Sequence, residues 1–371
     1  MTATNVVVFG AGKIGITIAD FLKGSGDYAV TIADSDQRAL KRAAKADIDT
    51  RPIDVKDDKA RKRAIQGNEV VVSALPYYLN VPVAETARAA GAHYFDLTED
   101  IATTRAIRKL ADDADTAFVP QCGLAPGFIS IVAHDLAKRF EKLDAVKMRV
   151  GALPQFPSNE LMYNLTWSTD GLINEYCNSC EAIVDGKKTE LRPLEGAEHF
   201  SLDGVTYEAF NTSGGLGTLA ETLERKVRNL DYKTVRYPGH RDLIRMLARD
   251  LRLCDRRPLF REVLENAVPA TTQDVVLVFV TVTGWNDGEL MQESFARKIY
   301  SGIVNGKMRS AIQITTAAGA CAMVDLVTAK RLPQSGFVTQ ESADFKDFIA
   351  NRFGRHYAGS GIGRREGDRG K

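Results

Sequence analysis

Asn5-Val6-Val7-Val8-Phe9-Gly10-Ala11-Gly12-Lys13-Ile14-Gly15 is an apolar strand that runs directly into a glycine-rich turn and the start of a helix. Gly10 permits the tight turn, and Gly12 lets the backbone approach a pyrophosphate. Gly15 lets the helix pack closely on the strand, and the helix N-terminus attracts the anion. The segment therefore predicts a phosphate-binding turn, with Lys13 and Ile14 beside the phosphates. The alternative is an ordinary strand–helix turn without a ligand.

A second predicted strand, 29–33, ends in Asp34, 19 residues beyond Gly15. An acid at this distance can hydrogen-bond the ribose hydroxyls of a dinucleotide. Its charge would repel a 2′-phosphate, so Asp34 predicts NAD as the cofactor, with NADP as the alternative. Arg38 lies four residues further on and could either reach a phosphate or be a solvated helix side chain.

Length and composition exclude several classes of protein. The chain has 371 residues, 44% of them hydrophobic, with 49 basic and 48 acidic side chains, which is enough for two domains with separate cores. The near-neutral charge predicts no nucleic-acid and no membrane partner, and no apolar run reaches the roughly 20 residues of a membrane span. The first strand leaves no room for a signal peptide, so we expect a cytoplasmic protein.

The cysteines predict neither a disulfide framework nor a metal site. Five cysteines are few and odd in number. Cys177 and Cys180 have C-x-x-C spacing, but no second pair or histidine cluster lies close in sequence to complete a zinc site. We interpret this spacing as chance.

Apolar strands and amphipathic helices alternate from Met1 to about Gln121. The predicted strands are 5–9, 29–33, 51–53, 69–74, 93–96 and 116–121, and the predicted helices are 14–24, 36–46, 57–66, 80–90 and 100–113. This alternation predicts an α/β domain over 1–124 with a Rossmann-type, doubly wound parallel sheet. Ligands bind at the carboxyl ends of such strands, so Ser73, Ala74, Leu75 and Pro76 are expected to contact the cofactor.

The pattern changes after Pro126. Alternating runs at 146–150, 161–168, 207–212 and 274–283 predict antiparallel strands, and Asp185-Gly186, Asp203-Gly204 and Asn305-Gly306 predict hairpin turns. These features predict a second, α+β domain over 125–310 with a mixed or antiparallel sheet.

The C-terminal part divides into an apolar segment and a polar one. An apolar helix from about 311 to 332, ended by Pro333, begins a segment over 311–350 that is expected to pack back on the first domain. Residues 354–371 are rich in glycine and arginine and are expected to form a flexible tail.

Several of these segments together resemble the saccharopine dehydrogenase family. The glycine-rich turn, the Ser73–Pro76 loop, Tyr94-Phe95-Asp96-Leu97 and Gly123-Leu124-Ala125-Pro126-Gly127 occur in the family's order. Residues 208–215 and 232–240 are most similar to the lysine 6-dehydrogenase branch, whereas 154–163 is as similar to the glutamate-forming saccharopine dehydrogenases.

The resemblance implies NAD(P)-dependent oxidation at a carbon–nitrogen bond of an amino acid. Lysine would give the ε-semialdehyde and ammonia, and saccharopine would give the same semialdehyde and glutamate. A homodimer is also implied, because sheets of the second domain often pair between subunits in this family. The alternative from another class is a protein that binds the dinucleotide without turnover.

Hydride loss requires a neutral amine, although a free ammonium has a pKa of about 10.4, so some group must accept a proton. Asp96, at the end of strand 93–96, is one candidate, and its alternative role is to cap the next helix. His240 follows the turn Pro238-Gly239 and titrates near neutrality; its alternative is a surface position. We expect both residues to face the cleft between the domains.

Four further residues are expected to contact the substrate. Arg236 could bind a carboxylate through two hydrogen bonds, or could belong to a structural ion pair. Thr212 and Ser213 precede two glycines and could hold a carboxylate, or could only form a hairpin turn. Tyr77 could wall the nicotinamide pocket, or could simply pack.

Overall fold

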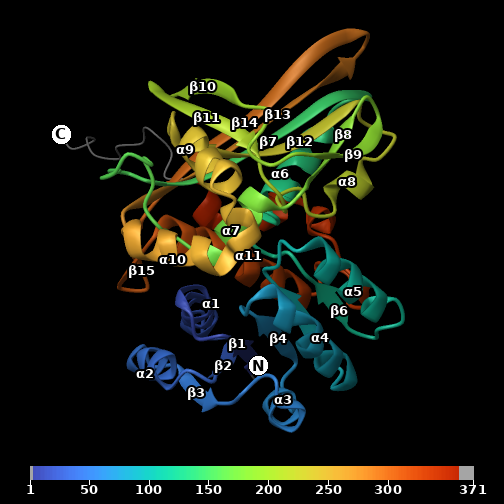
Figure 1. Ribbon diagram of the computed structural model, residues 1–371. Helices are drawn as coiled ribbons and strands as arrows, with labels where there is room; N and C mark the ends of the chain where they lie inside the picture. Colours follow the sequence, from blue (N-terminus) through green and yellow to red (C-terminus); the bar gives the residue numbers. More distant parts are fainter. Residues whose placement is uncertain (1–2, 359–371) are drawn as a thin grey trace, which may run out of the picture.

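A parallel sheet forms the first half of the molecule in the computed structural model, which describes residues 3–358 (Figure 1). Its strand order is β17-β6-β5-β4-β1-β2-β3. The strands are β1 (Thr4–Phe9), β2 (Tyr28–Asp34), β3 (Asp49–Pro52), β4 (Val70–Ser73), β5 (His93–Asp96), β6 (Ala117–Val119) and β17 (Gly336–Phe337). The helices are α1 (Lys13–Gly24), α2 (Gln37–Lys45), α3 (Asp58–Ile65), α4 (Asn80–Ala89) and α5 (Ile101–Ala111).

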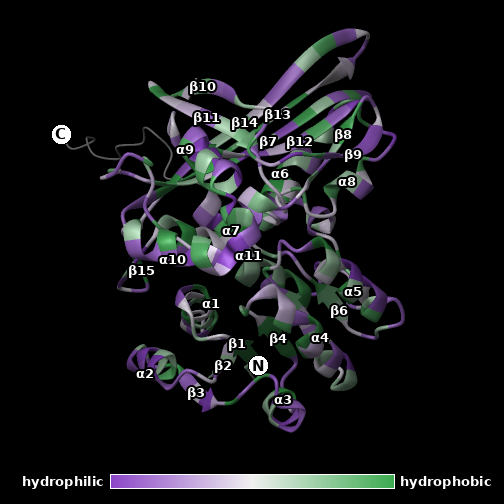
Figure 2. Cartoon of the chain, viewed as in Figure 1, coloured by the Kyte–Doolittle hydropathy of each residue, from purple (hydrophilic) through white to green (hydrophobic). Residues whose placement is uncertain are grey.

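The predicted Rossmann-type fold is thus confirmed for the first domain. Val6, Val7 and Val8 of β1 and the valines of β4 are fully buried. Helices cover both faces of such a sheet, which is why its central strands are apolar on both sides. Figure 2 shows hydrophobic residues along the central strands and largely hydrophilic residues on α2 and α3.

A mixed sheet forms the second half, with the strand order β10-β11-β12-β7-β13-β14 and with β8 and β9 attached beside β12. Its strands are β7 (Lys142–Pro154), β8 (Cys180–Val184), β9 (Lys187–Leu191), β10 (Glu198–Leu202), β11 (Val205–Asn211), β12 (Asn229–Arg236), β13 (Asp274–Asn286) and β14 (Glu289–Tyr300). Strand β12 pairs with β7 in parallel, and the other neighbours pair antiparallel. The predicted mixed sheet is therefore present.

The second sheet curls until its outer strands approach each other. Phe200 on β10 stacks on Phe279 of β13, with ring centroids 5.3 Å apart. Lys298 on β14 forms an ion pair with Asp203 in the turn after β10, at 3.0 Å. The concave side thereby encloses a small apolar core, while the other side packs against helices.

Short helices and one hairpin connect the strands of this half. They are α6 (Phe128–Ala137), α7 (Thr169–Cys177), α8 (Leu219–Thr222), α9 (His240–Arg245), α10 (Arg257–Ala267), and the hairpin β15 (Gly302–Val304) with β16 (Lys307–Arg309). The strand predicted over 161–168 was wrong. That segment forms only an isolated bridge from Leu165 to Ala270, because no strand lies beside it to complete a ladder.

The chain returns to the first sheet through α11 (Ala311–Thr328), which packs against α1. It is the one described helix that is long and apolar enough to cross a membrane, and 78% of it is buried inside the protein, as in a core helix. Strand β17 then pairs with β6, and α12 (Phe345–Ala350) follows.

The first residues of the segment predicted as a flexible tail, 354–371, are folded against the core. Gly354–Tyr357 form a 3₁₀ turn, and Tyr357 is buried with its ring stacked on Phe128 at 3.8 Å. The tyrosine supplies apolar area that the glycine- and arginine-rich composition of the segment conceals. Residues 359–371 of the predicted tail lie outside the described residues.

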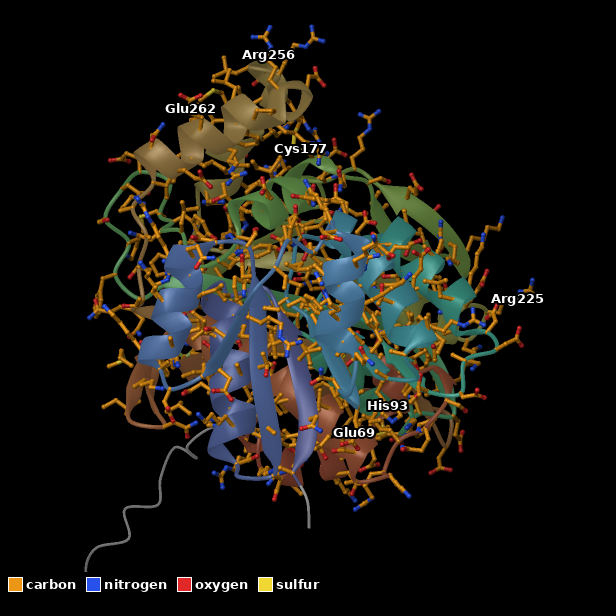
Figure 3. All side chains as sticks on the ribbon, turned by 90° about the horizontal axis from the view of Figure 1, so that it is seen from below. Glu69, His93, Cys177, Arg225, Arg256 and Glu262 are labelled. Atoms are coloured by element: carbon orange, nitrogen blue, oxygen red, sulfur yellow. A yellow bond between two sulfur atoms is a disulfide. The ribbon has the colours of Figure 1, made fainter. Side chains whose placement is uncertain are left out.

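One disulfide corrects the expectation from the cysteine count. Cys177, at the end of α7, is bonded to Cys254 in the 3₁₀ turn Leu253–Arg256, with a sequence separation of 77 residues. Figure 3 shows Cys177 beside the segment that carries Arg256 and Glu262. Cys180 is a buried free thiol, so the C-x-x-C spacing itself is incidental.

Candidate functional site: the cleft at the edge of the parallel sheet

The glycine-rich turn has the shape that a pyrophosphate requires. Gly10 has a φ of +100°, which favours glycine, and a Cβ at Gly15 would lie 1.8 Å from the Gly10 carbonyl oxygen. A Cβ at Gly12 would meet no atom within 4 Å. Gly12 caps α1 without a side-chain hydrogen bond, so free backbone N–H groups and open space meet there. These features fit the phosphates of a dinucleotide.

Asp34 is held beside this turn by two backbone hydrogen bonds. The Ala11 N–H donates to its Oδ2 at 2.6 Å, and the Asp36 N–H donates to its Oδ1 at 2.8 Å. The carboxylate is thus fixed at the end of β2 and remains partly exposed. It lies where an acid can bind the ribose hydroxyls. Arg38 is exposed on α2.

A cavity of about 650 Å³ lies at the carboxyl edge of the parallel sheet, beneath the second domain. From the first domain it is lined by Ile14, Ala74–Tyr78, Leu97–Glu99 and Gly123–Pro126. From the second domain it is lined mainly by Trp167, Ser168, residues of α7, Tyr232, Thr234 and Arg236 on β12, and Arg257 and Arg261 on α10. The strand ends expected to carry ligand chemistry therefore meet the second domain here.

Two carboxyl groups, Glu99 and Glu175, line the cavity from opposite domains. Desolvation, and after it the negative charges of Glu175 and Asp100, raise the pKa of the Glu99 carboxyl to about 8. Desolvation also raises the pKa of Glu175 to about 7, against the opposing charge of Arg236. Both groups can therefore exchange protons near neutral pH, which suits acid–base chemistry.

Arg236 is 2% exposed and is the first of several side chains that are hydrogen-bonded in series, from the cavity into the second domain. Its guanidinium lies 3.6 Å from Glu175, and its Nε donates to the Tyr176 hydroxyl at 3.3 Å. Tyr176 is 2.9 Å from Nε2 of His240, whose Nδ1 is 2.8 Å from the Leu161 carbonyl oxygen. Since a carbonyl only accepts, Nδ1 carries the hydrogen and Nε2 accepts from the tyrosine.

Two family models together cover nearly the whole chain. The saccharopine dehydrogenase NADP binding domain matches residues 6–119, and the saccharopine dehydrogenase C-terminal domain matches residues 123–356. The chain belongs to the saccharopine dehydrogenase family. It is accordingly a dehydrogenase that uses a nicotinamide dinucleotide, and the shape of the glycine-rich turn agrees with this cofactor.

Curated relatives in the family are distant. An NADP⁺-dependent, L-glutamate-forming saccharopine dehydrogenase of Pyricularia oryzae is 23% identical over 332 residues, which cover 83% of this chain and 73% of that protein. The Saccharomyces cerevisiae protein of the same name is 26% identical over 199 residues, 49% of this chain and 43% of the relative. A rat mitochondrial alpha-aminoadipic semialdehyde synthase is 23% identical over 50% of this chain and 21% of its own length.

The fold agrees with this assignment. The apo saccharopine dehydrogenase (L-Glu forming) of Saccharomyces cerevisiae superposes with a TM-score of 0.77 over 93% of this chain and 96% of that structure, at 18% identity. At this identity the likeness concerns the fold alone.

Some residues that the sequence predicts for this dehydrogenase site do line the cavity. They are Ile14, Ala74, Leu75, Pro76, Tyr77 and Arg236. Gly10, Gly12, Gly15 and Asp34 form the turn described above, and Lys13 is the exposed first residue of α1. Ser73 instead is buried and donates its hydroxyl hydrogen to Asn80.

The two predicted proton acceptors do not line the cavity. Asp96 is fully buried, and its carboxylate accepts from the N–H groups of Thr98 and Gln121 and from the Tyr94 hydroxyl. Neither is it the cap of the next helix, since Asp100 holds that position. His240 is also fully buried, behind Tyr176 and Arg236. The expectation that both face the cleft was wrong, because hydrogen bonds inside each domain occupy them.

Thr212 and Ser213 support the cavity wall from behind. The Thr212 hydroxyl is 2.7 Å from the hydroxyl of Thr234, which lines the cavity, and Ser213 donates to the Asn174 carbonyl at 2.9 Å. Glu99 and Glu175 were missed. Glu99 lies in a strand-end segment that could have signalled it, whereas Glu175 is one polar residue on a helix and carries no such signal.

A positioning role for His240 can be tested through stability. Burial, and after it the charge of Arg236, lower the pKa of His240 to about 3. The histidine therefore stays neutral in the fold, and as pH falls below its unfolded pKa the unfolded chain binds the extra proton. We expect His240→Asn to lower the free energy of unfolding by about 1–3 kcal/mol at pH 7.5, through lost hydrogen bonds.

The stability difference between His240→Asn and the unmodified protein should narrow between pH 6.5 and pH 4, because only the unmodified protein loses the contribution of a neutral histidine. Urea denaturation at pH 7.5 and pH 5 measures it, with the exposed His199→Asn as control. A difference that does not narrow on acidification would contradict the assignment. For activity, His240→Asn should raise KM for the substrate through Arg236 while cofactor affinity is unchanged.

Proposed function

We propose that this enzyme oxidises L-lysine at the ε-amine and releases the ε-semialdehyde and ammonia, as an enzyme of lysine metabolism. The observation that supports this is the charge around the cavity. The charged side chains that line it are three acids, Glu99, Asp170 and Glu175, and three arginines, Arg236, Arg257 and Arg261, of which only Arg236 is fully buried. Arg236 already lies 3.6 Å from Glu175. Such a wall suits an amine and one carboxylate better than the three carboxylates of saccharopine.

In this proposal the first domain binds the cofactor and the second domain covers the substrate. The glycine-rich turn, Asp34 and the segment Ala74–Pro76 would hold the nicotinamide dinucleotide, which supplies the hydride acceptor. The second domain covers the carboxyl edge of the sheet and limits the access of water to the reacting carbon. Arg236 would hold the substrate carboxylate. Arg257, held by the side-chain oxygens of Asn174 and Asn178 at 2.6 and 2.5 Å, adds a further positive charge to the cavity.

The second candidate is oxidation of saccharopine to the same semialdehyde and glutamate. Two observations favour it. Curated relatives are named glutamate-forming saccharopine dehydrogenases. In addition, Arg257 and Arg261 line the cavity together with Arg236, so a substrate with several carboxylates would find cations at both ends.

Formation of the reduced cofactor with each amine separates the two candidates. The unmodified enzyme is assayed at pH 7 to 10 with L-lysine and with saccharopine, and released ammonia and glutamate are measured. L-norleucine, which lacks the ε-amine, is the control. We expect turnover of lysine with one ammonia per reduced cofactor. Turnover of saccharopine with glutamate release, and none of lysine, would contradict the proposal.

We also propose that NAD is the preferred cofactor, because the carboxylate of Asp34 is fixed beside the turn and would repel a 2′-phosphate. The kcat/KM ratio of NAD to NADP should exceed 1 and should fall about 10-fold or more in Asp34→Ala, as expected for one charge pair of about 1.4 kcal/mol. Lys45→Ala, at the exposed last residue of α2, is the control. Equal use of both cofactors by the unmodified enzyme would show that Asp34 does not select between them.

A homodimer is proposed from exposed apolar side chains of the second domain. Leu290 at the start of β14 is 63% exposed, and Ile303 and Met308, which face each other across the β15–β16 hairpin, are 72% and 65% exposed. A partner subunit would remove these side chains from water. Light scattering at micromolar concentration should give twice the mass of one chain. A mass of one chain would refute the dimer.

A further inference from the structure

The Glu99 side chain lies against two glycines of the second domain, Gly171 and Gly214, where any larger residue would collide with it. A Cβ at Gly171 on α7 would lie 3.0 Å from the Glu99 Oε1, and a Cβ at Gly214 would lie 2.8 Å from the Glu99 Cβ. Both distances are shorter than ordinary contacts of a Cβ. The side chain of a first-domain residue is thus inserted into the wall built by the second domain.

The Glu99 carboxylate has no hydrogen-bond or ion-pair partner among residues 3–358, although Glu99 is half-buried and lines the cavity. Glu175, on the same cavity wall, does have partners: Arg236 at 3.6 Å and the Thr234 hydroxyl at 3.5 Å. A carboxylate without a partner in such a place is costly unless a cation or a proton neutralises it. It therefore marks the position that a cationic group of a ligand would take.

We propose that Glu99 binds the ammonium group that is to be oxidised and accepts its proton. The proposal rests on the amine-oxidising function above, but it applies to lysine and saccharopine alike, because both carry a protonated amine.

Proton and hydride balance in this scheme. The ammonium gives one proton to the Glu99 carboxylate and becomes a neutral amine. The carbon beside it then loses a hydride to the oxidised nicotinamide, and the substrate becomes an iminium ion. Water adds to that carbon, and the carbon–nitrogen bond breaks to give the aldehyde and a protonated amine, which carries the positive charge of the iminium ion. The proton on Glu99 is finally released to solvent, so Glu99 starts the next turnover as a carboxylate.

The groups around Glu99 support this assignment. Asp100 lies on the same loop, Glu175 is on α7, and Tyr232 is on β12, while Arg236 faces Glu175 rather than Glu99. Two of these neighbours are acids, and together with desolvation they raise the pKa of Glu99 to about 8. Since the base must be ionised to accept a proton, kcat/KM should rise with pH through about 8.

Glu99→Gln keeps the shape of the side chain and removes its basicity. We expect kcat to fall about 100-fold, the low end for loss of a general base, and the rise of kcat/KM near pH 8 to disappear. Cofactor affinity and the thermal midpoint should be unchanged. Glu224→Gln, at an exposed position outside the cavity, is the matched control and should behave as the unmodified enzyme.

A binding measurement tests the same residue without turnover. L-lysine and saccharopine are each titrated by calorimetry into the enzyme with bound reduced cofactor, in two buffers of different ionisation enthalpy. At pH 7 an ammonium that binds Glu99 displaces its proton, so the unmodified enzyme should release close to one proton more than Glu99→Gln. The difference should vanish at pH 9.5, where Glu99 is already ionised.

These outcomes separate the inference from the proposed function. Extra proton release with saccharopine but not with lysine would overturn lysine as the substrate and support Glu99. Equal proton release by Glu99→Gln and the unmodified enzyme, or a kcat of Glu99→Gln within threefold, would overturn the role of Glu99 and leave the substrate assignment intact. An enzyme that binds neither amine would overturn both.

Discussion

Gly12→Ala is expected to leave the protein folded and to weaken binding of the nicotinamide dinucleotide about 10- to 100-fold, or about 1.4–2.8 kcal/mol. The new methyl group would meet no protein atom within 4 Å, and Gly12 has an extended backbone with φ −72°, which alanine adopts without strain. The same methyl group would project in front of the α1 N-terminus, where the backbone must approach the pyrophosphate. Fluorescence titration with reduced cofactor and a thermal melt measure the two effects.

Two other glycines provide the controls. Gly302→Ala also meets no atom within 4 Å and lies in β15, away from the turn, so neither stability nor cofactor affinity should change. Gly15→Ala should instead lower the thermal midpoint, because its Cβ would lie 1.8 Å from the Gly10 carbonyl oxygen. If Gly12→Ala binds the cofactor as tightly as the unmodified protein, the pyrophosphate does not lie against this turn.

The first domain could be predicted from the sequence because its signals are local. Each strand is a short apolar run, each helix has its own period, and the glycine spacing belongs to one turn. The conformation at Gly10 and the close approach at Gly15 are consequences of that turn. Asp34 was placed correctly beside it for the same reason, since its position depends only on where β2 ends.

The site could be predicted only in part, because most of it depends on contacts between distant segments. Glu99 and Glu175 are 76 residues apart and belong to different domains, and nothing in the sequence near Glu175 marks it as facing a cavity. Asp96 and His240 were chosen for their residue type and their place in motifs. Their actual partners, including Tyr176 and the Gln121 backbone, become visible only in the folded chain.

The same limit explains the errors outside the site. The disulfide joins Cys177 to Cys254 across 77 residues, and an odd cysteine count cannot reveal one such pair. The segment 161–168 has the alternation of a strand but no neighbouring strand to pair with. In each case the missing information is which segments meet, and local sequence does not contain it.

Arg236→Met is expected to reduce both activity and stability strongly. The guanidinium is buried beside Glu175, donates to Tyr176 and lies 4.9 Å from the Tyr163 ring centroid. Burial disfavours its charged form, but Tyr176, Tyr163 and Glu175 outweigh this effect and raise its pKa. Its removal leaves Glu175 without a cation, and breaking a buried ion pair in this way costs about 3–5 kcal/mol. Urea denaturation at pH 8.5, where Glu175 of the unmodified protein is ionised, measures the loss.

Activity should fall because the cavity loses its one fully buried cation. We expect kcat/KM for lysine to drop at least about 100-fold, mostly through KM, as for a lost charge-assisted contact of about 3 kcal/mol with the substrate carboxylate. Arg297→Met, on the exposed part of β14, is the control for removing an arginine outside the cavity. An unchanged KM would show that the carboxylate binds elsewhere, for instance at Arg257.

The double variant Glu175→Gln/Arg236→Met separates the two roles of Arg236. Without the charge of Glu175, loss of the guanidinium no longer leaves an unpaired carboxylate, so the double variant should recover about 1–3 kcal/mol of the stability lost by Arg236→Met alone. Its kcat/KM should not recover, because the substrate carboxylate still lacks its partner. Removal of Arg236 should raise the pKa of Glu175 above its value of about 7, because the neighbouring cation is gone. Below pH 7 Glu175 is therefore protonated in Arg236→Met, and the stability that this variant loses relative to the unmodified protein should become smaller. Equal stability of Arg236→Met and the double variant at pH 8.5 would show that Glu175 and Arg236 are not energetically coupled. The ion pair with Glu175 would then not stabilise the position of Arg236.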